Sequence, residues 1–304
     1  MSNLKEVRTR IQAIRSTRQI TSAMKMVAAS RLHKTQQSIH PLRTFAAALR
    51  ELLGGILAQL PSTPESPFFR QGQGGEALVI AVSSNKGLCG TYNVMVIKKT
   101  LEHIRMLEEE GYRVRLLVVG KKAEKFFEKR KQALFSVEHD LVDLVSHDAS
   151  SRFSRSMLDA FFTGKFERLD VVYYQFRNAV YQELVAEQVL PLSFESLASA
   201  EATHPEPKTE KPAHPDDYFG YILEPDPQDV SDTLIPQFLA TNFHRIFLEA
   251  AASEHGARMT SMHKATDNAD ELLNSLTLTY NKARQAQITR EIMEIVGGAE
   301  VLRS

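Results

Sequence analysis

The loop SSNKGLCG, residues 83–90, has the residue types that could bind an anion. It follows an apolar, β-branched run, EALVIAVS (76–83), and ligands of α/β proteins commonly bind at such strand ends. A phosphate-binding loop needs GxxxxGK[ST] and a dinucleotide fingerprint needs GxGxxG, and this loop matches neither. The loop is therefore predicted to be a structural or partner-contact turn, made by Lys86, Gly87, Leu88, Cys89 and Gly90.

A catalytic or metal-binding role is not indicated by the other reactive residue types. Cys89 is the single cysteine, and no histidine or acid stands at a diagnostic spacing from it. Five histidines fall in predicted long helices, but none forms an HxxxH or HExxH pattern: His33, His40, His244, His255 and His263. We expect no catalytic residue, no metal ion and no cofactor.

Charge is concentrated in one segment. The whole chain has 37 basic and 37 acidic residues, but residues 1–50 hold ten basic residues and one acid, Glu6, for a net charge of +9. Such a segment favours an acidic or anionic neighbour. Phe45 is its only aromatic residue, and its apolar residues form a narrow stripe, so a protein partner is favoured over nucleic acid or a membrane surface.

Composition places the chain in a broad class. Among 304 residues, 43% are apolar and 24% are charged, which is ordinary for a soluble globular protein. No apolar run approaches the roughly 18 residues that a membrane span needs. The first ten residues, MSNLKEVRTR, do not resemble a secretory signal, and a lone cysteine suits a reducing compartment.

The basic segment is predicted to be one long helix over residues 2–57, about 84 Å long at a rise of about 1.5 Å per residue. Apolar or small residues recur at alternating spacings of three and four, which is typical of a coiled-coil seam. Arg18 and Lys25 are the exceptions, and Pro41 should kink or break the helix. The seam is Leu4, Val7, Ile11, Ile14, Arg18, Thr21, Lys25, Ala28, Leu32, Thr35, Ile39, Leu42, Ala46, Leu49, Leu53 and Ile56.

A second long helix is predicted from about 231 to 296, because this stretch is nearly free of proline and glycine. Its expected seam is Ala265, Ala269, Leu272, Leu276, Thr279, Ala283 and Ala286. Each helix needs a partner, so we expect the two to form an antiparallel coiled coil. Three acids on the second helix are expected to face the basic helix: Asp267, Asp270 and Glu271.

The middle of the chain is predicted to be an α/β domain over 76–222, Rossmann-like with a largely parallel sheet, because β-branched runs alternate with helical patterns. Expected strands are 76–83, 114–119, 170–176 and 180–192, and expected helices are 91–110, 121–131 and 150–163. Residues 61–75 and 198–217 are predicted loops. The coiled-coil helices would then occupy 1–57 and 228–304.

Four segments resemble the gamma subunit family of rotary ATP synthases: ITSAMKMVAAS (20–30), SSNKGLCGTYN (83–93), ARMTSMHKATDNADEL (257–272) and YNKARQAQITREIMEIVGGA (280–299). They occur in the family's order across the whole chain. The paired cysteines of the redox-regulated chloroplast form are absent, which indicates a bacterial form.

The resemblance implies a rotor in the central stalk of the catalytic head, without a catalytic site of its own. Its coiled coil would stand inside a ring of alpha and beta subunits, and its α/β domain would rest on epsilon and the membrane c-ring. Proton flow would turn it, at the cytoplasmic face of a bacterial inner membrane. A coiled-coil scaffold or a nucleotide-binding enzyme would explain only part of the pattern.

Residue roles follow from the same resemblance. Arg284, Gln285 and Thr289 match positions that form a catch with a beta-subunit loop in the family. Met24 and Lys25 are expected on the part of the shaft that faces beta. The turn from Lys86 to Gly90 is expected to contact epsilon or the c-ring.

Overall fold

The protein is described here by a computed structural model covering residues 2–58, 66–69, 74–132, 134–143, 145–193, 197 and 227–301. The chain divides into two compact units, Met1–Ser30 with Arg258–Ser304 and Arg31–Ala257. Two long helices, α1 (Ser2–Ala58) and α7 (Pro227–Val301), contribute to both units. The predicted loops 61–75 and 198–217 lie mainly or wholly outside the described residues.

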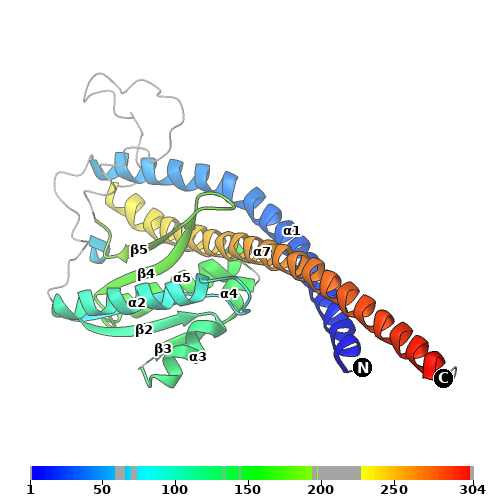
Figure 1. Ribbon diagram of the computed structural model, residues 1–304. Coiled ribbons are helices and arrows are strands. Elements are labelled where there is room, and N and C mark those ends of the chain that lie inside the picture. The colour runs from blue at the N-terminus through cyan, green and yellow to red at the C-terminus, as the bar shows by residue number, and fades with distance from the viewer. Residues whose placement is uncertain are drawn as a thin grey trace. The chain divides into compact units, whose positions relative to one another are not determined.

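The first unit is an antiparallel pair of helices, with the start of α1 and the end of α7 toward the same end (Figure 1). The hydroxyl of Thr266 donates to the hydroxyl of Thr21 over 2.9 Å. One turn farther along the pair, Arg18 forms an ion pair with Asp270. The predicted pairing of N- and C-terminal helices is confirmed within this unit.

The seam predicted along α1 is confirmed. Every seam residue from Leu4 to Ile56 is buried or half-buried except Arg18, which is exposed. Arg18 occupies a seam position, but its charged end stays in solvent, where it pairs with Asp270.

The seam predicted along α7 is correct in part. Ala269, Leu276 and Ala283 are buried or half-buried, but the structure corrects three predicted positions, Leu272, Thr279 and Ala286, which are exposed. The half-buried positions in their place are Leu273, Tyr280 and Gln287. After Ala269 the seam advances by four residues instead of three, and the adjacent leucines 272 and 273 fit either spacing.

Helix α1 is not broken by Pro41 and continues through Gly54 and Gly55. Pro41 lies on an exposed side, where water can bond the carbonyl that the proline ring leaves without a donor. A Cβ atom on Gly54 would lie 2.8 Å from the carbonyl oxygen of Leu197, so this glycine permits a close backbone approach.

The second unit contains a five-stranded sheet in the order β3-β2-β1-β4-β5. Strands β1 to β4 run parallel, and β5 is antiparallel to β4. The bounds are β1 Glu76–Val82, β2 Arg113–Val119, β3 Leu134–Glu138, β4 Arg168–Phe176 and β5 Gln182–Leu190. The predicted α/β class with a largely parallel sheet is confirmed, and β3 is an additional edge strand that the sequence did not predict.

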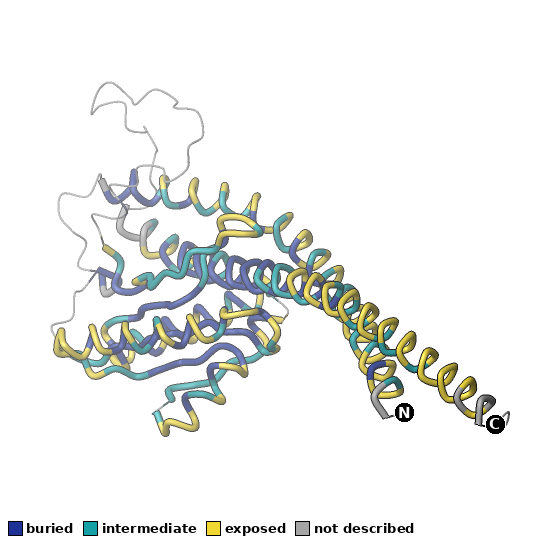
Figure 2. Tube along the Cα trace, viewed as in Figure 1, coloured by how far each residue is buried: buried dark blue, intermediate teal, exposed yellow. Residues whose placement is uncertain are grey.

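Helices cover both faces of the sheet (Figure 2). On one face α2 and α3 bury apolar side chains such as Ile104 and Phe127. On the other face α5 and the domain halves of α1 and α7 bury Phe153, Leu53 and Phe247. The helices are α2 Tyr92–Glu109, α3 Lys121–Lys129, α4 Asp140–Asp143 and α5 His147–Phe162, with a 3-10 turn at Pro67–Phe69. None of the described helices is both long and apolar enough to cross a bilayer.

The helix pairing predicts a specific cross-link. In a chain with Cys89→Ser, the changes Thr21→Cys and Thr266→Cys should form a disulfide on mild oxidation, because their hydroxyls already lie 2.9 Å apart. Non-reducing gel mobility measures it. Ile20→Cys with Thr266→Cys is the control, since Ile20 is 60% exposed and one helical position away. Equal cross-linking of both pairs would contradict the register.

Candidate functional site

The loop after β1 is a tightly hydrogen-bonded turn. The Ser84 hydroxyl donates to the Lys86 carbonyl over 2.6 Å, and the Ser84 amide donates to the Asn93 side-chain oxygen over 2.9 Å. Leu88 has a φ of 64° and is 62% exposed, so the turn presents an apolar side chain outward. Of the five predicted turn residues, Lys86, Leu88 and Gly90 are exposed, Gly87 is half-buried and Cys89 is buried.

The backbone donors at the start of α3, which could otherwise hold a phosphate, are used by this same loop. The amides of Lys121 and Lys122 donate to the Asn85 side chain and the Ser84 carbonyl at 3.0 and 3.1 Å. The amide of Ala123 donates to the Ser83 hydroxyl at 3.1 Å. Because a helix N-terminus binds an anion through such free amides, this arrangement favours a structural turn.

Gly120 makes that closure possible. Its φ of 98° suits glycine, and a Cβ atom there would lie 2.4 Å from the Ser83 carbonyl oxygen. The ends of β1 and β2 can therefore approach closely enough for the loop to cap α3.

The loop is also fixed to α7. Cys89, Tyr92 and Val96 form a small apolar cluster that packs with Ala257. The Tyr92 hydroxyl donates to the carbonyl of Ala250 over 3.2 Å. Cys89 is 1% exposed and its sulfur accepts a bond of 3.1 Å from the Asn93 amide, an environment that suits a packing residue.

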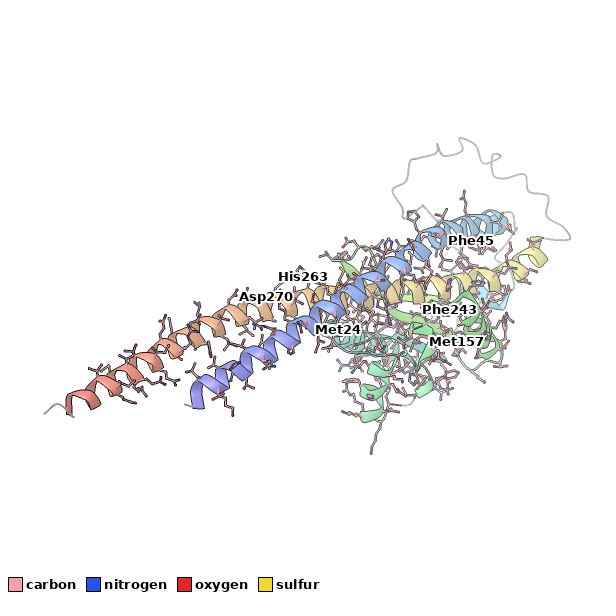
Figure 3. The ribbon with its side chains drawn as sticks, turned by 90° about the vertical axis from the view of Figure 1, so that its right-hand side faces the viewer. Met24, Phe45, Met157, Phe243, His263 and Asp270 are labelled. Carbon is pink, nitrogen blue, oxygen red and sulfur yellow. The ribbon has the colours of Figure 1, made fainter. Side chains whose placement is uncertain are left out.

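In the first unit, α1 carries cationic and apolar side chains away from its seam. Met24 and Lys25 are half-buried, and Figure 3 marks Met24 on α1 and Asp270 on α7. The exposed apolar residues nearest to Met24 are Ile20, Met26 and Val27, at 60%, 62% and 56% exposure. Exposed cations of this stretch include Lys5, Arg8 and Arg15.

On α7, the three predicted catch residues Arg284, Gln285 and Thr289 are all exposed. Gln287 is half-buried, and every residue from 288 to 296 is exposed. Five of these are large and apolar, with 47–70% exposure: Ile288, Ile292, Met293, Ile295 and Val296. The sequence reasoning did not single out this apolar end, although ITREIMEIV shows it directly.

No cluster of three metal-ligating side chains (His, Cys, Asp or Glu) occurs within the part of the chain that the structure describes. The acids predicted to face the basic helix behave differently from one another. Asp270 pairs with Arg18, whereas Asp267 pairs with His263 on its own helix at 3.3 Å.

Comparison with known proteins identifies the family. A family model described as ATP synthase matches residues 3–302. The ATP synthase gamma chain of Flavobacterium psychrophilum is 41% identical over 303 residues, covering 100% of both chains. That of a Synechococcus species is 36% identical over 318 residues, again covering 100% of both.

Two solved structures share the fold. A chain of the Euglena gracilis mitochondrial ATP synthase (OSCP/F1/c-ring) gives a TM-score of 0.63 at 18% identity, with 99% of this chain and 95% of that chain covered. A Tetrahymena thermophila central stalk/c-ring chain gives 0.56 at 20% identity, with 81% and 99% covered. With the family model and the curated relatives matching along nearly the whole length, the chain belongs to the ATP synthase gamma chains.

Proposed function

We propose that this chain is the rotor that couples turning of a membrane c-ring to conformational change at catalytic sites on beta subunits. Rotation driven by proton flow would present different faces of an asymmetric shaft to the beta subunits in turn. Each site would change its affinity because its contacts with the shaft change. The chain would contribute contacts and stiffness, and the chemistry would stay on its partners.

The observation that carries the proposal is the exposed apolar end of α7. The large apolar side chains there are exposed within a stretch, 288–296, in which every residue is exposed: Ile288, Ile292, Met293, Ile295 and Val296. Contiguous exposed apolar surface normally marks an interaction site. A ring of alpha and beta subunits around this end would cover it, while the cationic side chains of α1 would face acidic groups on beta.

A non-catalytic role agrees with the geometry of the loop after β1. Its side chains and carbonyls already occupy the amides at the start of α3, so a bound nucleotide would have to displace Ser84 and Asn85. The remaining proposed partners are epsilon and the c-ring. The chain would then be peripheral to the cytoplasmic face of a bacterial inner membrane and held there only through the complex.

Reconstitution tests the proposal. The chain should co-purify with alpha and beta subunits, and it should restore ATP-driven proton pumping when added to gamma-depleted complexes in vesicles. The chain alone should show no ATPase activity. A coiled-coil scaffold would bind partners without restoring pumping, and a nucleotide-binding enzyme would turn over ATP alone, so either result overturns the proposal.

The catch residues give a first variant. Gln285→Leu should impair assembly and coupled ATP turnover, because the amide is proposed to bond a beta-subunit loop. The free energy of unfolding of the isolated chain should change by no more than about 0.5 kcal/mol, since the site is exposed. Asn274→Leu, an exposed amide three turns earlier, is the control and should leave turnover near wild type. Large, equal losses of stability and turnover would show that Gln285 is a packing residue.

The shaft gives a second variant. Met24→Lys should lower the ratio of ATP synthesis to proton flow while the complex still assembles, because an added cation can bind an acidic beta-subunit group in one rotary position. Met26→Lys is the matched control, with the same substitution two positions along α1 at a 62% exposed site. If Met24 only packs against α7, the variant would instead lose about 1–3 kcal/mol of stability and keep its coupling.

The loop gives a third test. Leu88→Cys in a Cys89→Ser chain should cross-link to epsilon or the c-ring within the assembled complex, because Leu88 projects outward from a rigid turn. Contact with a beta subunit is the alternative outcome, because the loop packs against Ala257 of α7. Mass spectrometry of the product decides, and a beta adduct would refute the contact with epsilon or the c-ring.

A further inference from the structure

A buried group of charged side chains joins the long helices to the sheet in the second unit, and the proposed subunit contacts do not use it. We call it the buried ionic network and define it as Arg43 of α1, Tyr173 of β4, Glu187 of β5, and Arg245 and Glu249 of α7. The Glu249 side chain is 1% exposed and that of Arg245 is 15% exposed.

Arg245 is the centre of the network. Its Nη2 atom lies 2.8 and 3.0 Å from the two carboxylate oxygens of Glu187. Its Nη1 atom donates to the Tyr173 hydroxyl over 3.0 Å, and that hydroxyl donates to Glu187 over 2.6 Å. The planar guanidinium therefore binds both strands of the β4–β5 pair at a fixed angle.

Arg43 extends the network to α1. Its Nε and Nη2 atoms lie 3.1 and 3.0 Å from one carboxylate oxygen of Glu249, and Nη2 also donates to the Phe176 carbonyl over 2.6 Å. The second Glu249 oxygen lies 3.5 Å from Arg245. A continuous set of polar contacts thus runs from α1 through α7 to β4 and β5.

Two cations face two carboxylates, and the contact between Arg245 and Glu187 favours the ionised form of both of these side chains. Burial alone would lower the pKa of Arg245, but Glu187 and the neighbouring groups outweigh it and raise that pKa. Burial alone would raise the pKa of Glu187, but Arg245 and the Tyr173 hydrogen bond outweigh it and lower that pKa. Burial raises the pKa of Tyr173 well above its ordinary value, so the phenol keeps the proton that it donates.

Much of the same interface is apolar and includes Phe243 and Phe247, which pack against Phe153 (Figure 3 marks Phe243). Two further polar side chains of α7 support the network: the Asn242 amide donates to Glu187 over 3.5 Å, and the Ser253 hydroxyl donates to the Tyr174 carbonyl over 3.1 Å. Apolar burial is not directional, so it fixes the rotation of a helix less strictly than polar bonds of defined geometry do. Turning by one residue rotates a side chain by about 100°. The contacts of the Arg245 guanidinium with Glu187 and Tyr173 do not survive that rotation.

We propose that the buried ionic network is a torsion clamp, which holds α7 and α1 in one rotational register against β4 and β5 so that the sheet and the helices turn as one body. This inference rests on the proposed rotor function and adds the residues that would resist slip. The four ionic side chains are positioning residues, since they act through the helices and not on a reacting group.

The sheet offers a matched control. Asp170 of β4, 1% exposed, lies 2.6 Å from the His103 ring and accepts two bonds from Arg168. This second buried ionic group joins β4 to α2, and none of these three residues belongs to α1 or α7. Disrupting it should weaken the domain without freeing the long helices.

The experiment uses the complete complex in sealed vesicles and measures protons pumped per ATP hydrolysed. Arg245→Met with Glu187→Leu replaces a buried ion pair by apolar groups of similar size, which proteins often tolerate. ATP hydrolysis should persist while protons pumped per ATP fall by about threefold or more. Arg43→Met, at a side chain that is 25% exposed, is the milder second variant and should shift the ratio in the same direction.

Asp170→Asn should lower the thermal midpoint of the isolated chain and leave the pumping ratio unchanged. A wild-type ratio in both network variants overturns the clamp, and so does an equal fall in the Asp170→Asn control, which would indicate general loss of stability. Failure of the rotor function itself would look different, because the wild-type chain would then not restore pumping to gamma-depleted complexes.

Discussion

The structure depends on the pairing of two helix seams from opposite ends of the chain. Helix α1 has 57 residues and α7 has 75. Each carries a narrow apolar stripe that a single helix cannot shield from water. In the first unit the stripes cover one another, as the Thr21–Thr266 contact shows. In the second unit the sheet supplies the apolar surface for both. The contacts proposed between the ends of these helices and other subunits use the surface that this pairing leaves uncovered.

The α/β domain has the topology of a ligand-binding fold, but at the sheet edge where ligands usually bind its polar groups bond to one another. Ser83, Ser84 and Asn85 occupy the amides at the start of α3 that an anion would need. Gly120 allows the two strand ends to approach closely enough for this. These bonds close the edge of the sheet at which enzymes of this class usually bind ligands, which supports the proposal that the domain holds helices and does not bind nucleotide.

The sequence predicted features that depend on local periodicity and missed those that depend on choices between similar residues or on long-range contacts. The seam of α1 was predictable because its spacing continues for many turns. The phase of α7 after Ala269 was not, since Leu272 and Leu273 are chemically equal and only packing distinguishes them. Strand β3 was missed because LFSVE is short and lies at a sheet edge. Arg43 and Glu249 stand 206 residues apart, so nothing local indicates that they meet.

For the candidate contact residues, the structure of the isolated chain does not predict a role. Arg284, Gln285 and Thr289 are exposed polar residues on a helix, and isolated geometry gives such residues no role. Their assignment comes from resemblance, and the fold contributes one constraint, which is that they lie off the seam and are exposed. The apolar residues from Ile288 to Val296 differ in this respect, because exposed apolar side chains have a cost in water that polar ones lack. A partner surface can therefore be inferred at the end of α7 from physics alone, and the polar catch beside it gains support from lying next to that surface.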